Sequence, residues 1–151
     1  MATKAESYPV LYQQACALAE KEDDAIALMA NLAALLHESM HFLWTGWYRV
    51  RGYELVLGPF QGQLACTRIP FGKGVCGTAW KEQATQVVPD VELFPRHIAC
   101  SSESKSEIVV PVMRGGEVTA VLDIDSERPG TFDDVDREWL ERIASLVGGL
   151  S

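Results

Sequence analysis

Apolar residues recur at helical spacing in two stretches near the N-terminus of the chain. The first stretch follows Ser7 and Pro9, a pair that is typical of a helix start. The second follows the acidic pair at residues 23–24 and repeats apolar positions three or four residues apart. From this spacing we expect two helices that pack on a sheet or on a partner.

The middle of the chain changes to strand-like composition. Residues 42–50 are rich in aromatic and β-branched side chains, and the turn at 51–52 leads into residues 53–57, so we expect a hairpin. The shorter segments that follow are expected to form a strand, a helix and a strand, at residues 65–70, 75–83 and 85–88. Residues 89–106 show no clear period and are expected to form a long ordered loop, which in a compact domain is often functional.

A second hairpin and a closing helix complete the pattern. Residues 107–113 and 118–125 flank a Gly-Gly pair, and Asp133 is a candidate N-cap for an apolar helix face that ends near residue 148. This order of elements indicates an α+β domain with a mainly antiparallel sheet. We expect a single domain at 1–151, with N-terminal helices at 1–40, the sheet and its site-bearing loops at 41–130, and a C-terminal helix at 131–151.

Length and charge limit the function classes. The 151 residues suffice for one buried core, and the net charge of −8 argues against nucleic acid or an anionic membrane as a partner. The first twenty residues lack the apolar core of a secretory signal, and the most apolar stretch, 25–36, is too short to span a bilayer. We therefore expect a cytoplasmic protein.

The stretch FGKGVCGT, residues 71–78, has the G-x-G-x-x-G spacing of a dinucleotide fingerprint. That fingerprint requires a βαβ unit with parallel strands, whereas the strongest strand signals here are hairpins. We expect instead that these glycines let the backbone turn tightly and bring Cys76 close to another part of the chain.

Alternation along the 107–125 hairpin separates an apolar even-numbered face from an odd-numbered face that bears carboxylates. Opposed residues must share a face, so we expect a three-residue loop at 115–117 with Arg114 opposite Val118. Carried along the ladder, this register sets Glu107 beside Asp125.

The odd face has two possible interpretations. It is either an ordinary solvated face or, since Val109, Pro111 and Val121 share it, the wall of a covered pocket. In a covered pocket Glu107 and Asp125 cannot easily both ionise, so one of them keeps its proton near neutral pH. A protonated carboxylic acid suits a reaction in which an oxygen is a poor leaving group.

Four cysteines raise the question of metal or thiol chemistry. A zinc site normally includes a close pair such as C-x-x-C, which is absent, so we predict no metal. Cys16 is expected to be a small buried hydrophobe without a role. Cys100 is the best candidate nucleophile because it precedes the acidic strand; the alternative is a buried loop anchor. His97 is expected to lie on the surface.

Several segments together resemble one known family. The segment SEIVVPVMRGGEVTAVLDIDSERPGTFDDVDREWLERI resembles the C-terminal half of a GAF domain. With GPFQGQLACTRIPFGKGVCGTAW and VPDVELFPRHIACSSESKSE, it is similar to the free methionine-(R)-sulfoxide reductases, over nearly the whole chain from Tyr8. The implied fold is a single GAF domain with terminal helices on one sheet face and a loop-covered pocket on the other.

The resemblance also implies roles for the cysteines. Cys100 would attack the sulfoxide sulfur, Cys76 would resolve, and Cys66 would serve in recycling or as an alternative resolving thiol. The disulfide would then be Cys76–Cys100 or Cys66–Cys100.

The family's other site residues fall on matching positions of this chain. Its acidic residues correspond to Glu107, Asp123 and Asp125, grouped around the sulfoxide oxygen. Glu107 and Asp125 would supply the proton, with Asp123 in support. Its aromatic pocket residues correspond to Trp44 and Tyr48, which share strand parity.

The implied activity is reduction of free L-methionine (R)-sulfoxide through a cysteine sulfenic acid and an intramolecular disulfide. Thioredoxin would be the reductant, no cofactor would be needed, and the resemblance suggests a homodimer. The alternative is a GAF module that senses a small molecule without catalysis.

Overall fold

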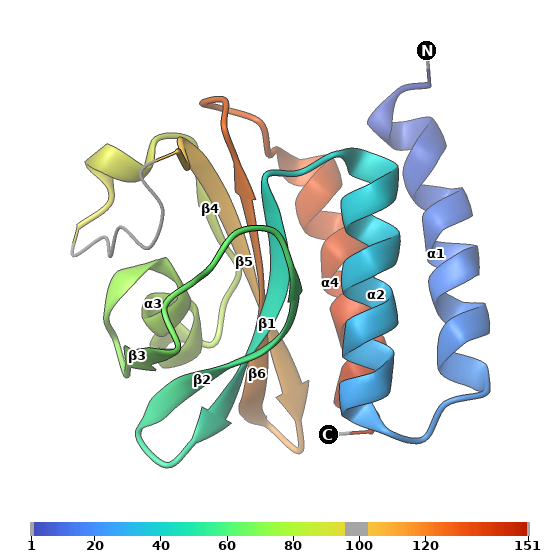
Figure 1. Ribbon diagram of the computed structural model, residues 1–151, viewed down its shortest axis with the longest axis horizontal. Coiled ribbons are helices and arrows are strands. Elements are labelled where there is room, and N and C mark those ends of the chain that lie inside the picture. The colour runs from blue at the N-terminus through green and yellow to red at the C-terminus, as the bar shows by residue number, and fades with distance from the viewer. Residues whose placement is uncertain (1, 96–102, 151) are drawn as a thin grey trace.

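The computed structural model describes residues 2–95 and 103–150. Helices cover both faces of one central sheet (Figure 1). The helices are α1 (Lys4–Glu20), α2 (Ala25–Met40), α3 (Gly74–Glu82) and α4 (Asp134–Gly148), with a 3-10 turn η1 (Val91–Leu93). The strands are β1 (Trp44–Arg51), β2 (Glu54–Gln61), β3 (Arg68–Pro70), β4 (Gln86–Val88), β5 (Ser106–Arg114) and β6 (Glu117–Ser126).

The six strands are ordered β3-β2-β1-β6-β5-β4, and each strand pair in the described residues is antiparallel. The two hairpins, β1–β2 and β5–β6, are joined through β1 and β6 at the centre. The expected α+β fold with a mainly antiparallel sheet is therefore confirmed, and the absence of parallel pairs in this sheet agrees with the rejection of a dinucleotide fingerprint.

One face of the sheet packs against α2 and α4, and α1 packs on these two helices on the side away from the sheet (Figure 1). The even-numbered residues of β5 and β6 enter this core, as the alternation predicts, with Ile108, Leu122 and Ile124 fully buried. Trp47 of β1 is also fully buried and donates its indole N–H to the Met29 carbonyl of α2 at 2.9 Å. None of the helices in the described residues combines the length and apolar character that a bilayer-spanning helix requires.

The opposite face of the sheet carries a second, smaller core under α3. It combines residues of β1, β2, β5 and β6 that face this side of the sheet with residues of the elements that cover it. They include Val109, Val121, Tyr48, Val75 and Cys76. Because this face is also covered, the carboxylates on it lie in a buried environment rather than on a solvated surface.

The β5–β6 register confirms the pairing at the acidic end and corrects the turn. Glu107 lies opposite Asp125, as predicted. At the other end Arg114 pairs with Glu117, so the loop has two residues, and a bulge between Val112 and Met113 restores the parity. The expected pairing of Arg114 with Val118 is wrong, because the bulge, rather than a longer loop, absorbs the odd residue.

Two element boundaries also differ from expectation. Helix α1 begins at Lys4 rather than near Ser7, because Thr3 and Glu6 form a reciprocal capping box that lies before Pro9. The stretch 65–70 forms a strand only at its last three residues, and residues 62–67 are a loop. That loop brings Cys66 to the α3 side of the sheet.

The glycines of the FGKGVCGT stretch act as turn and packing residues, as expected. Gly72 and Gly74 have φ angles of +74° and +63°, which favour glycine. A Cβ at Gly77 would lie 2.7 Å from the Pro70 carbonyl oxygen, so this residue lets the first turn of α3 approach β3 closely. The close approach fixes Cys76, the preceding residue, against the sheet.

We expect Gly77→Ala to destabilise the fold because the added methyl group must displace backbone atoms. The free energy of unfolding in urea should fall by about 1–3 kcal/mol. Gly149→Ala is the matched control, because the nearest atom to its new Cβ lies at 3.8 Å, and its change should stay within about 0.5 kcal/mol. Equal stabilities for the two variants would contradict this packing role.

Candidate active site

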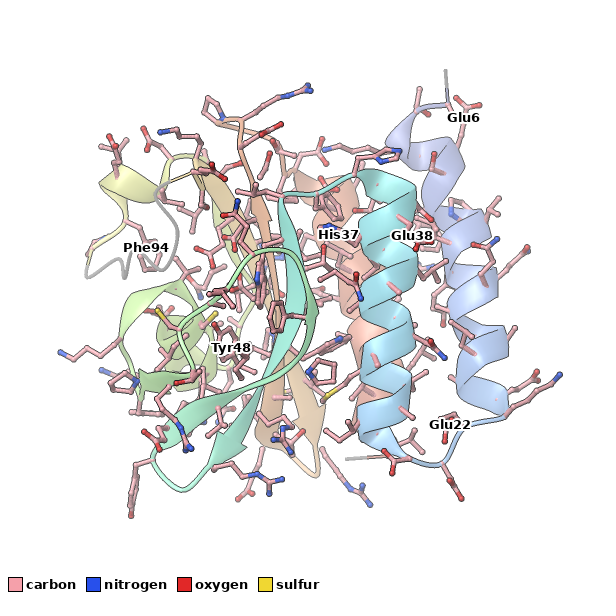
Figure 2. All side chains as sticks on the ribbon, viewed as in Figure 1. Glu6, Glu22, His37, Glu38, Tyr48 and Phe94 are labelled. Carbon is pink, nitrogen blue, oxygen red and sulfur yellow. The ribbon has the colours of Figure 1, made fainter. Side chains whose placement is uncertain are left out.

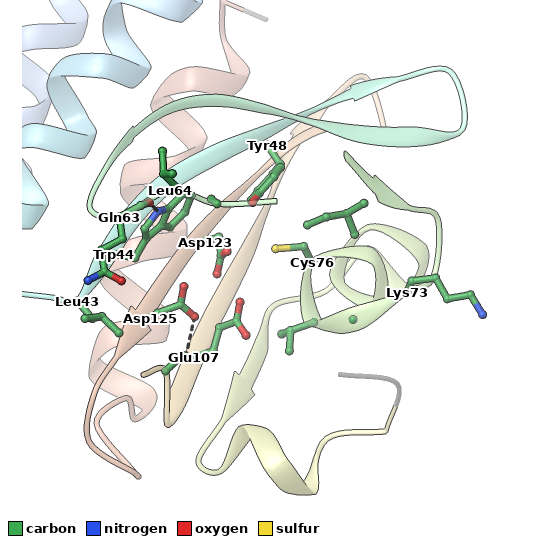
Figure 3. Close-up of a pocket in the computed structure, with 15 residues that line it drawn as sticks. Leu43, Trp44, Tyr48, Gln63, Leu64, Lys73, Cys76, Glu107, Asp123 and Asp125 are labelled. Atoms are coloured by element: carbon green, nitrogen blue, oxygen red, sulfur yellow. Dashed lines mark hydrogen bonds between the residues drawn. The ribbon is translucent and has the colours of Figure 1, made fainter. Parts of the chain in front are cut away.

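A cavity of about 50 Å³ opens on the α3 side of the sheet, between β1, β5, β6, the 62–67 loop and the start of α3 (Figure 3). About 10–15 Å³ is enough for one water molecule, so the cavity admits several ligand atoms. Its lining residues are Leu43, Trp44, Tyr48, Gln63, Leu64, Ala65, Ile69, Lys73, Gly74, Val75, Cys76, Ser104, Glu107, Asp123 and Asp125.

Three carboxylates converge at one end of this cavity. Glu107 comes from β5, and Asp123 and Asp125 come from β6, with Glu107 directly opposite Asp125. All three point into the cavity in Figure 3, and Glu107 and Asp123 are 7% and 6% exposed. The sequence-based grouping of these acids is thus reproduced in space, within a pocket that excludes most water.

The environment of the acids favours their protonated forms. Burial raises the pKa of Glu107 well above its ordinary value, and the neighbouring charges of Asp123 and Asp125 raise it further. Burial and the charge of Asp123 likewise raise the pKa of Asp125, but hydrogen bonds from Ser104 and Glu107 act in the opposite direction. The proton shared by the pair is therefore assigned to Glu107, and the protonated Glu107 carboxyl group donates a hydrogen bond to Asp125.

Ser104 is a site residue that the sequence did not reveal. Its side chain is buried, and its hydroxyl donates to Asp125 Oδ1 at 3.1 Å. Ser104 lies two residues before β5, in a segment whose sequence shows no periodicity. The sequence therefore gave no indication that its side chain faces the cavity. Its hydrogen bond stabilises the ionised form of Asp125 and thereby separates the roles of the two paired acids.

Trp44 and Tyr48 form an aromatic wall beside the acids, as their shared parity predicts. The ring centroids of Trp44 and Tyr48 lie 6.0 Å apart, and Phe60 stacks on Trp44 with a centroid distance of 5.2 Å. A Cβ at Gly46 would lie 2.6 Å from the Trp44 ring, so glycine is needed beneath the indole. The cavity thus has an acidic end and an apolar aromatic side, which suits a ligand with one polar oxygen and an apolar group.

The cysteines occupy different environments. Cys76 is buried and free at the cavity wall, and burial together with the charge of Asp123 raises its thiol pKa well above the ordinary value. Cys66 is disulfide-bonded, and Cys16 is free, so neither Cys16 nor Cys76 is its partner. Cys100, the candidate nucleophile, lies outside the described residues, as does His97.

Among the described residues, one group has the composition of a metal site. Cys76, Glu107 and Asp123 each place a possible ligand atom within 4.8 Å of the others. A cation would have to displace the protons that burial keeps on Cys76 and Glu107. The expectation of a metal-free site stays a prediction.

Comparisons with known proteins agree with the fold. The chain matches the family model of the GAF domain over residues 11–149. It is 50% identical over 146 residues to GAF domain-containing protein A of Dictyostelium discoideum, an alignment that covers 96% of this chain and 92% of that protein.

Two further relatives carry a functional name. The free methionine-R-sulfoxide reductase of Escherichia coli is 43% identical over 145 residues, which are 95% of this chain and 88% of that protein. The structure of the free methionine-R-sulfoxide reductase from Neisseria meningitidis, in complex with its substrate, superposes with a TM-score of 0.97 at 47% identity. That match covers 99% of this chain and 91% of the other. The chain therefore belongs to the GAF-domain family of free methionine-R-sulfoxide reductases.

The raised pKa of Glu107 predicts how stability depends on pH. Above the ordinary value of 4.5, the unfolded chain releases this proton before the folded protein does, so raising the pH favours unfolding. Relative to Glu107→Gln, the free energy of unfolding should fall by up to about 1.4 kcal/mol per pH unit until the folded pKa is reached.

Urea unfolding between acidic and mildly alkaline pH measures this difference. Glu82→Gln, at the exposed end of α3, is the control and should keep the pH dependence of the unmodified protein. Parallel stability curves for the unmodified protein and Glu107→Gln would show that Glu107 ionises at its ordinary pKa.

Proposed function

We propose that this protein reduces free L-methionine (R)-sulfoxide to L-methionine. The observation that carries the proposal is the convergence of Glu107, Asp123 and Asp125 beside the Trp44–Tyr48 wall in one covered cavity. A sulfoxide oxygen fits the acidic end, because a protonated carboxyl group can donate to it. The S-methyl group fits the aromatic side, which offers apolar contact. The named relatives support both the reaction and its stereochemistry.

Reduction of the sulfoxide needs only a thiolate and a proton donor, and side chains of this protein supply both. The Cys100 thiolate attacks the substrate sulfur while Glu107 delivers a proton to the sulfoxide oxygen. Oxygen passes from the substrate sulfur to Cys100, which becomes a sulfenic acid, and methionine is released. Glu107 then regains a proton from solvent through the open cavity, and the charges of Asp123 and Asp125, which raise its pKa, hold that proton on Glu107 for the next turnover.

A second thiol then condenses with the Cys100 sulfenic acid to give a disulfide and water. The family resemblance implied Cys76 for this step and kept Cys66 as the alternative. The disulfide at Cys66 supports the alternative, because Cys76 is free, buried and held as a neutral thiol. We therefore assign the disulfide-forming step to the Cys66 thiol, and we assign to Cys76 only a place in the lining of the cavity.

Thioredoxin-type exchange would restore the two thiols. Cys66 is partly exposed, so a partner can approach its side of the loop. We also propose a cytoplasmic location, where thioredoxin keeps thiols reduced. A homodimer is proposed on the partly exposed apolar side chains of the terminal helices, Val10 and Ile26.

A single turnover without external reductant tests this function. The reduced protein should release about one methionine per chain from the free R diastereomer, and little from the S diastereomer, with loss of two thiols. Cys100→Ser should abolish methionine release without unfolding the protein. Ligand binding without methionine release or thiol loss would instead indicate a sensing GAF module.

The two candidate resolving thiols make a matched pair of variants. Cys66→Ser should release one methionine per chain and then stop, because the sulfenic acid has no thiol to condense with. Cys76→Ser should continue to turn over with thioredoxin, at a rate lowered only by repacking of the cavity wall. The reverse result would reassign resolution to Cys76.

The carboxylate pair predicts non-additive kinetics. Asp125→Asn and Glu107→Gln should each slow the first chemical step by roughly 10²–10⁴-fold, the range for a positioned general acid. The double variant should lose far less than the product of the two, because the acids share one proton.

Single-turnover rates of methionine release measure this coupling. Asp134→Asn, at the exposed start of α4, is the control and should react like the unmodified protein. Fully multiplicative losses would mean that Glu107 and Asp125 act independently.

A further inference from the structure

Tyr48 has a polar contact that its place in the aromatic wall does not explain. Its side chain extends from β1 on the α3 side of the sheet, opposite the side where His37 of α2 lies (Figure 2). The phenol is 2% exposed, and its hydroxyl donates to the Cys66 carbonyl oxygen at 2.8 Å. A phenol has a single O–H hydrogen, so this contact uses the donor that would otherwise face the ligand.

Trp44 makes a parallel contact with the same loop. The indole N–H donates to the Gln63 carbonyl oxygen at 3.0 Å. Gly62 lies flat on the ring, since a Cβ there would come within 2.6 Å of the indole and its φ angle is +132°. The two aromatic donors on the α3 side of β1, Trp44 and Tyr48, therefore hold carbonyl groups of residues 62–67, which we call the Cys66 loop.

The Cys66 loop buries little surface of its own. Gly62, Gln63, Leu64 and Thr67 are exposed, and Leu64 is 92% exposed. Its far end is fixed by a backbone hydrogen bond from Leu57 to the Thr67 carbonyl at 3.0 Å. Exposed loops with few apolar contacts open easily, so contacts from the rigid sheet decide how well such a segment is ordered.

We propose that Tyr48 is a positioning residue for Cys66, and that its hydroxyl serves the disulfide-forming step rather than sulfoxide binding. This inference rests on the proposed function, in which the Cys66 thiol displaces water from the cysteine sulfenic acid. Fixing the Cys66 carbonyl restricts the backbone that carries the thiol. The thiol is then held near its attacking geometry, which raises the rate of an intramolecular reaction.

The Tyr48 hydroxyl can donate its hydrogen bond to the Cys66 carbonyl oxygen at every pH at which the protein works. Burial raises the pKa of Tyr48 well above its ordinary value, and the negative charges of Asp123 and Asp125 raise it further. It therefore stays a hydrogen-bond donor throughout the pH range in which the thiols react. The ring forms the cavity wall, and the hydroxyl orders the Cys66 loop.

Tyr48→Phe separates these two roles, because it keeps the ring and removes the donor. In one single turnover, quenched samples give the rate of methionine release and the rate of disulfide formation, and a dimedone-type probe traps the sulfenic acid. Disulfide formation should slow at least about tenfold relative to methionine release, the scale expected when a reacting group loses its fixed position. The sulfenic acid should accumulate between the two steps.

Two further proteins make the test specific. Tyr53→Phe is the matched control, because Tyr53 is 91% exposed, and both of its rates should equal those of the unmodified protein. In a Cys66→Ser background, adding Tyr48→Phe should leave the lifetime of the sulfenic acid unchanged, since the thiol that it positions is already absent.

The outcomes distinguish this inference from the proposed function. If the unmodified protein releases no methionine, the proposed function fails. If it releases methionine and loses two thiols, but Tyr48→Phe slows both steps equally or neither step, the positioning role is wrong. A shortened or lengthened sulfenic acid lifetime on adding Tyr48→Phe to Cys66→Ser would also overturn it.

Discussion

The crowding of three carboxylates at the end of one antiparallel hairpin is the constraint on which the rest of the site depends. The β5–β6 register sets Glu107 opposite Asp125, with Asp123 on the same face, and the covering elements leave little water to separate their charges. Three ionised groups at this spacing would repel one another strongly, so burial and mutual charge keep a proton on Glu107. That proton is what makes the cavity suited to an oxygen acceptor.

The fold supports this arrangement by covering both faces of the sheet. The larger core, under α1, α2 and α4, fixes the even-numbered residues of β5 and β6 and thereby the direction of the odd-numbered ones. The smaller core under α3 supplies the apolar surroundings that raise the pKa values of Glu107 and Cys76. The proton of Glu107, which would be lost in water at neutral pH, is therefore retained in the site.

Parity and periodicity predicted the parts of the structure that depend on local spacing. The two hairpins, the short helix at α3 and the pairing of Glu107 with Asp125 follow from alternation, which repeats reliably along a strand. The bulge beside Met113 was missed because it depends on backbone geometry rather than on composition. Ser104 was missed because an irregular segment has no period from which to infer direction. The family resemblance gave the resolving role to Cys76, and spacing along the chain does not show that Cys76 is buried as a neutral thiol, which is why we propose Cys66 in that role instead.

A titration of the side-chain carboxyl carbons by NMR tests the central claim most directly. With Glu107→Gln and Asp125→Asn used for assignment, the Glu107 carbon should report a protonated carboxyl group at neutral pH, and its midpoint should shift down when Asp125 is replaced. Simple titration of Glu107 near its ordinary value of 4.5, unchanged by Asp125→Asn, would contradict the shared proton and the chemistry built on it.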